Sequence, residues 1–266
     1  MSRLAGPTYA GAMPSLGPRL ALAALTAVLL LTGCVDDDPN ASRPPGDEIT
    51  TEEAQVLAEV LNRNYGAGGA EVTVSAPYSP DAVLELTGTV DFTTSEGTLD
   101  AVTSYSNGQP EETRTVYFTA DRILIGNLPG FATAMADAGR PEALYLRLDL
   151  DQSRRLIDNV IGMIQRLGAE VPDDPDNLIA AGYTWQGNGR IDNTLISTFT
   201  TGSGTGTISI GAQDRLLHQF VSPPPGGDFP VTITLSGHGT KDIEFPPEAQ
   251  VADASAYPDV AVQFGF

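Results

Sequence analysis

The feature that most limits the fold is a change in the spacing of apolar residues along the chain. Between residues 84 and 92 apolar and polar residues alternate, as in a strand with one buried and one solvated face. Between residues 152 and 168 the apolar residues recur every three or four positions, which is the spacing of an amphipathic helix. Strand-like patterns then return as far as residue 245. This order of strands, helix and strands predicts one α+β domain with an antiparallel sheet.

The same patterns place the individual elements. Helices are predicted at 50–64, at 152–168 and around 177–181, and the segment 127–141 is predicted to be a loop with one helical turn. Strands are predicted at 84–92, 98–105, 113–119, 122–126, 144–150, 194–200, 206–211, 216–222, 229–236 and 241–245. We expect a single curved sheet, with the helices at 50–64 and 152–168 against its concave side.

The first 33 residues have the composition of a secretory signal. Arg3 and Arg19 are their only charges, and an apolar run from Leu20 to Leu31 follows. This run is too short for a membrane-spanning helix, which needs ~20 apolar residues, but it suits a cleavable signal. The exit, Leu-Thr-Gly-Cys ending at Cys34, resembles the bacterial lipobox, in which the cysteine receives a diacylglycerol and the signal is cut just before it. A plain signal peptide with a chance cysteine is the alternative.

Cys34 is the only cysteine of the chain, so it has no disulfide partner within it. A lone cysteine in a secreted protein needs a reason, and two acyl chains on Cys34 would hold the protein on the outer face of the cell membrane. The mature chain keeps 12 of the 14 basic residues against all 34 acidic ones, a formal charge of −22. Such a surface excludes nucleic acid as a partner, because affinity for nucleic acid comes from Lys and Arg.

The sequence divides into three parts. Residues 1–33 are the predicted lipoprotein signal peptide. Residues 34–48 are rich in Asp and Pro and almost free of apolar residues, which predicts a disordered acidic tether. Residues 49–266 are the predicted folded domain.

No pattern in the sequence indicates catalysis, a metal site or a cofactor. His218 and His238 are far apart in the sequence and lack ligand spacing, so we expect both to be exposed strand or turn residues. The glycine-rich segment 202–206 lacks the Lys-Ser/Thr of a phosphate-binding loop, and no serine lies in a Gly-x-Ser-x-Gly turn before a helix. We therefore expect a protein that is not an enzyme. An unrecognised degradative site is the weaker alternative.

Several stretches together resemble a known family. They are the lipobox, the helix at 54–64, Leu86–Phe92, Pro175–Leu178, and the ending formed by Ser236–Gly239 and Ile243–Pro247. In their order along the chain they resemble the actinobacterial lipoproteins of the LppX/LprG type, which share a half-barrel with the LolA/LolB carriers. The loop 127–141 departs from that family and leaves the cavity entrance undefined.

The resemblance implies a half-barrel whose apolar cavity holds the acyl chains of a lipid or glycolipid. It further implies transport of that ligand through the cell envelope, with a membrane transporter as a second partner. The alternative is a non-enzymatic interaction or sensor lipoprotein whose sheet is a scaffold for protein contacts.

Two apolar faces flank the space where such a cavity would lie. One belongs to the strand at 84–92 and the other to the helix at 152–168. The candidate ligand-binding residues are Leu84, Leu86, Val90, Phe92, Ile157, Val160, Ile161 and Ile164. A core position and a cavity position look the same in sequence, so the pattern alone leaves open whether the space is filled.

Overall fold

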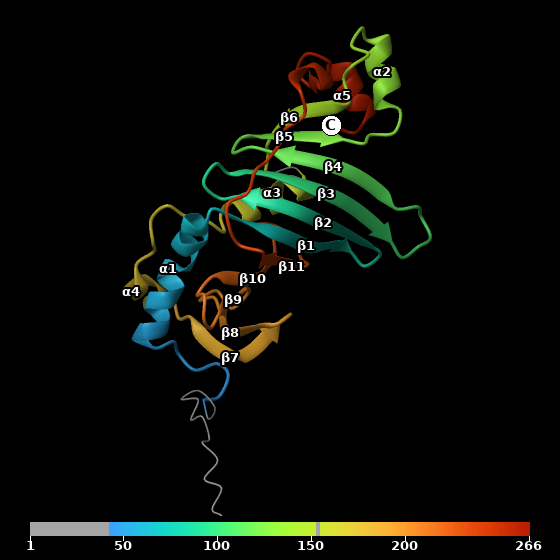
Figure 1. The fold of residues 1–266 in the computed structure, drawn as a ribbon. Coiled ribbons are helices and arrows are strands. Elements are labelled where there is room, and N and C mark those ends of the chain that lie inside the picture. The colour runs from blue at the N-terminus through green and yellow to red at the C-terminus, as the bar shows by residue number, and fades with distance from the viewer. Residues whose placement is uncertain (1–42, 153–154) are drawn as a thin grey trace, which may run out of the picture. The chain divides into compact units, whose positions relative to one another are not determined.

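The computed structural model describes residues 43–152 and 155–266. Cys34, the predicted signal peptide and residues 34–42 of the predicted tether lie outside this part. The described residues form one sheet of twelve strands in the order β12-β6-β5-β4-β3-β2-β1-β11-β10-β9-β8-β7 (Figure 1). The strands are β1 Gly69–Ser79, β2 Ala82–Asp91, β3 Glu96–Tyr105, β4 Glu112–Phe118, β5 Arg122–Gly126, β6 Tyr145–Asp149, β7 Thr184–Ile191, β8 Thr194–Thr200, β9 Thr207–Gly211, β10 Leu217–Ser222, β11 Val231–Ser236 and β12 Val251–Asp253.

The sheet is antiparallel with one exception, and it is curved into an open half-barrel (Figure 1). The exception is β12, which pairs with β6 in parallel over three residues. The prediction of a single curved antiparallel sheet in an α+β domain is therefore confirmed, with a short parallel edge that the sequence did not predict.

Alternate side chains of the central strands form the core on one face of the sheet. Val72 of β1 pairs with Gly88 of β2, which pairs with Leu99 of β3, and Leu99 pairs with Val116 of β4. The three apolar residues of this row are at most 1% exposed. Gly88 has no room for a side chain, because a Cβ there would lie 2.0 Å from the carbonyl oxygen of Thr98.

Five α-helices accompany the sheet in the described part. They are α1 Thr51–Ala67, α2 Phe131–Asp137, α3 Leu156–Gln165, α4 Pro175–Ala180 and α5 Pro258–Gln263. The start of α1 is fixed by a capping box, in which the Thr50 hydroxyl accepts from the Glu53 N–H at 3.2 Å and the Glu53 carboxylate accepts from the Thr50 N–H at 2.8 Å. The predicted helices at 50–64, 152–168 and 177–181 thus correspond to α1, α3 and α4.

A buried asparagine joins α1 to the end of α3 and to the sheet. Asn64 is 0% exposed, its amide donates to the Leu167 carbonyl at 2.8 Å, and its amide oxygen accepts from the Leu217 N–H at 3.1 Å. These bonds satisfy the polar atoms of a side chain that would otherwise be costly to bury.

The prediction of a strand at 241–245 is wrong. This segment runs across the strands from β11 to β12 instead of joining the sheet (Figure 1). Phe245 packs on Tyr117 with ring centroids 5.7 Å apart, and Tyr117 lies between the buried residues Val116 and Phe118, so the segment covers the face opposite the core. The alternation in the sequence does correspond to alternating burial, because Lys241, Ile243 and Phe245 are half-buried. No strand of the described part pairs with this segment, however.

Five elements of the described part were not predicted from the sequence. β1 has alanines and valines on its buried face, and β7 is glycine-rich with Trp185 as its only buried residue. The short 3-10 helix η1 Glu248–Gln250, β12 and α5 lie beyond the predicted strands. Weak apolar contrast explains the omission of β7, whereas β1 does alternate apolar and polar residues in the sequence and was overlooked.

The last part of the predicted tether contacts the domain. Glu48 forms a β-bridge with Thr184 at the start of β7. The Arg43 guanidinium donates to the Glu53 carboxylate at 2.8 and 2.9 Å and lies 5.2 Å from the Trp185 ring centroid. The folded part therefore begins by residue 43, before the boundary at 49 that composition suggested.

Candidate functional site

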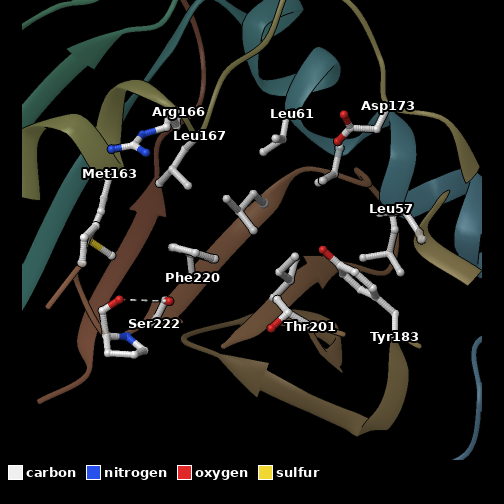
Figure 2. A pocket seen from close by; sticks show the side chains of 16 residues that line it. Leu57, Leu61, Met163, Arg166, Leu167, Asp173, Tyr183, Thr201, Phe220 and Ser222 are labelled. Atoms are coloured by element: carbon white, nitrogen blue, oxygen red, sulfur yellow. Dashed lines mark hydrogen bonds between the residues drawn. The ribbon is translucent and has the colours of Figure 1, made fainter. Parts of the chain in front are cut away.

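An apolar cavity of about 380 Å³ lies between helices α1, α3 and α4 and strands β9 and β10 (Figure 2). Its volume is within the range of small-molecule binding sites. The residues that line it are Leu57, Val60, Leu61, Met163, Arg166, Leu167, Asp173, Leu178, Tyr183, Thr201, Ile208, Leu217, Phe220, Ser222, Pro223 and Pro225. Aliphatic and aromatic side chains fill most of this wall, and the polar ones are few.

A β-bulge in β10 shapes the sheet wall of the cavity. Leu217 pairs with Ile210 and Gln219 with Ser209, so His218 is an extra residue on β10 with no counterpart on β9. Without the bulge, Leu217 and Phe220 would point to opposite faces, because side chains alternate along a strand. The bulge shifts this alternation, and both residues line the cavity.

The helix wall is built by the apolar stripe of α1 and by the end of α3. Figure 2 shows Leu57 and Leu61 on one side and Met163 and Leu167 on the other. The connection that follows α3 is held against α1 by two backbone bonds, from the Ala169 N–H to the Leu61 carbonyl at 3.0 Å and from the Asp173 N–H to the Ala58 carbonyl at 2.9 Å.

The two charged residues of the lining, Arg166 and Asp173, are exposed at its rim. Arg166 is the single positively charged residue of the lining, and its guanidinium donates to the Gly162 carbonyl and the Gln152 amide oxygen, both at 2.7 Å. Asp173 lies across the lining from Arg166 (Figure 2). Burial, followed by the negative charge of Asp173, raises the pKa of the Tyr183 hydroxyl, so this phenol stays neutral. The site thus pairs an apolar interior with a thin polar edge, which suits an amphiphilic ligand.

The candidate residues inferred from the sequence lie elsewhere on the same face. Six of them, Leu86, Val90, Phe92, Val160, Ile161 and Ile164, are buried in the core at no more than 3% exposure. Leu84 and Ile157 line another cavity at the start of α3, of about 250 Å³, so that the cavity of about 380 Å³ is the larger of these two. None of the eight lines the larger cavity, and contact of these residues with a ligand remains a prediction.

The residues that do line the larger cavity had a signal in the sequence. Leu57, Val60 and Leu61 form the apolar stripe that predicted helix α1, but a stripe does not indicate which part of the sheet it faces. The contribution of β10 had no such signal, because it depends on the bulge at His218.

The prediction that both histidines are exposed is wrong. His218 is only 8% exposed and His238 is half-buried, and their rings lie edge to face with centroids 5.3 Å apart. The His218 Nε2–H donates to the Asp214 carboxylate at 2.9 Å, and the His238 Nε2–H donates to the Leu217 carbonyl at 3.0 Å. The two rings are twenty residues apart in sequence, and only the pairing of β10 with β11 brings them together.

Within residues 43–152 and 155–266, no three His, Cys, Asp or Glu side chains are grouped so that they could hold a metal ion. No helix in those ranges is long and apolar enough to cross a membrane.

Comparison with known proteins gives a likeness of fold to solved structures. No protein-family model matches the chain, and no curated protein does so. Among solved structures it is similar to LprF from Mycobacterium bovis, with 15% identity and a TM-score of 0.45 over 75% of this chain and 98% of that one. At this identity the likeness concerns the fold alone and says nothing of a ligand.

Proposed function

We propose that this protein is a membrane-anchored lipoprotein that binds the acyl chains of a lipid or lipoglycan in the α1–α3–β10 cavity. It carries them through the cell envelope from the outer face of the cell membrane. The observation that supports the proposal is the apolar cavity of about 380 Å³ with a polar rim.

The energetics of such a cavity favour an alkyl chain. Each methylene removed from water contributes ~0.8 kcal/mol, so a segment of about ten methylenes gains ~8 kcal/mol before the cost of association. The aliphatic lining offers few partners for hydrogen bonds, so a strongly polar ligand would lose its hydration without replacement. Arg166 and Asp173 at the rim leave the polar end of an amphiphile in contact with water.

The anchor in this proposal is Cys34, nine residues before Arg43 in the sequence. Acylation at this position needs no element of the folded domain. Binding and anchoring can therefore be tested separately.

Native mass spectrometry of the unit Pro39–Phe266 tests the binding step. This unit contains the whole sheet and its core, so we expect it to fold by itself. We expect a fraction of the purified protein to carry extra mass that organic extraction removes, and the extract to contain an acyl lipid. The variant Leu61→Trp, which fills the cavity, should lack this mass, whereas Leu144→Trp, at an exposed position outside the lining, should keep it. A wild-type unit that carries no lipid and takes none up would favour the interaction scaffold.

A further inference from the structure

The histidine pair lies directly against the wall of the larger cavity. His238 donates to the carbonyl of Leu217, and Asn64 accepts from the N–H of the same residue. Leu217 is 1% exposed and its side chain lines the cavity. Both backbone groups of one lining residue are therefore held by side chains from outside its strand, one from α1 and one from the segment after β11.

The second histidine is the bulge residue itself. His218 is the extra residue of β10, and the bulge directs both Leu217 and Phe220 toward the cavity. Asp214, in the turn between β9 and β10, holds the His218 ring at 2.9 Å. The His218 ring in turn packs against the ring of His238 at 5.3 Å. The shape of the cavity wall thus depends on two imidazoles that are in contact.

The charged groups around the pair are few. Asp214 faces His218, and Lys241 follows β11 on the side of His238. Glu71 of β1 lies beside Gly237, the residue before His238. From α1 the contact to this region is the neutral Asn64. Burial and then the neighbouring His218 lower the pKa of His238, so the packed arrangement disfavours a proton on this ring.

We propose that the His218–His238 pair positions the β10 bulge for ligand binding and loosens it when the pH falls, so that the protein releases its ligand in acid. This inference rests on the proposed function and adds a means of regulation to the same cavity. A form in which the His238 ring has left His218 and entered water has the ordinary histidine pKa of ~6.5. As the pH falls, this open form takes up a proton at a higher pH than the packed form does. The packed form is therefore favoured above about pH 6.5 and loses that advantage at lower pH.

Such a coupling between protonation and binding also implies a reciprocal effect of the ligand on the histidine. If protonation of His238 opposes binding, then saturation with ligand must lower the pKa of His238 further, because the coupling between two binding events is mutual. Each unit by which the pKa of His238 differs between the ligand-bound and the free protein corresponds to a tenfold change in ligand affinity over the full titration.

The test measures affinity against pH with a probe that does not itself titrate. The unit Pro39–Phe266 is stripped of lipid and titrated with the neutral dye N-phenyl-1-naphthylamine between about pH 8 and about pH 5. We expect the dissociation constant of the wild type to rise at least about threefold toward acid. The variant His238→Gln keeps a side-chain N–H for the Leu217 carbonyl but cannot be protonated, so its dissociation constant should stay flat.

Two outcomes would overturn the inference alone. One is a wild type that binds the dye equally well over the whole range, and the other is a His238→Gln variant that loses affinity as the wild type does. A wild type that binds no dye at any pH overturns the proposed function, and the inference falls with it.

A second measurement decides the matter if His238→Gln does not fold. The chain has only two histidines, so ring-labelled protein gives two imidazole signals whose pKa values can be followed by NMR with and without the dye. We expect the dye to lower the pKa of His238. An unchanged or raised pKa of His238 would refute the coupling between its protonation and ligand binding.

Discussion

Two tryptophan substitutions can tell an open cavity from a filled core. Val160 of α3 is 0% exposed and packed in the core, whereas Leu61 of α1 is partly exposed and lines the larger cavity. At Val160 there is no space for an indole, so overpacking should cost ~1–3 kcal/mol. For a domain of this size that loss corresponds to a melting temperature lower by about 2–12 °C.

The indole of Leu61→Trp can instead occupy the cavity of about 380 Å³. Its cost should stay within the range of ordinary helix propensities, under ~0.7 kcal/mol, or less than about 3 °C in melting temperature. The same variant should retain no lipid, because the space is taken.

The assay is scanning calorimetry of lipid-free protein together with native mass spectrometry of protein as purified. Lipid must be removed first, because a bound ligand raises the stability of the wild type alone. The reasoning is refuted if Leu61→Trp is destabilised as much as Val160→Trp, since the space would then behave as filled core. It is also refuted if Leu61→Trp keeps the bound lipid.

Three further outcomes follow from single residues. In the full chain, Cys34→Ser should move the protein from the membrane fraction to the soluble fraction, and an unchanged distribution on cell fractionation would refute lipidation. Asn64→Ala leaves the buried N–H of Leu217 without its partner and should cost ~1–3 kcal/mol or more in denaturant unfolding, so a loss within error would show that the joint is unimportant. Thr50→Ala removes the helix cap and should cost ~1 kcal/mol, whereas Thr51→Ala at the next, exposed position should cost much less.

The pattern of apolar residues was sufficient to predict elements whose two faces differ strongly. The strand predicted at 122–126 has the same bounds as β5, and the helix predicted from 50 begins at Thr51 as α1 after its cap. In both cases local chemistry decides the structure, through a side chain that caps the helix or a clear contrast between neighbours.

Segment 241–245 marks the limit of such patterns. Its alternation predicts that one side is covered, and Ile243 and Phe245 are indeed half-buried. The half-buried side could lie beside a neighbouring strand or on the face of a sheet. Which of the two occurs depends on the segments that pack against residues 241–245, and these residues do not encode it.

The sequence by itself thus determined the α+β class, the long amphipathic helices and which face of each element is apolar. Only the tertiary structure decided where those faces leave space, because α3 sits directly on the core while α1 and the bulged β10 enclose a cavity. It also decided that His218 meets His238, and that Asn64 of α1 holds Leu217. Such contacts depend on the register of strand pairing and on one extra residue in β10. A local pattern carries no record of either, since the physics that fixes them acts between segments distant in the chain.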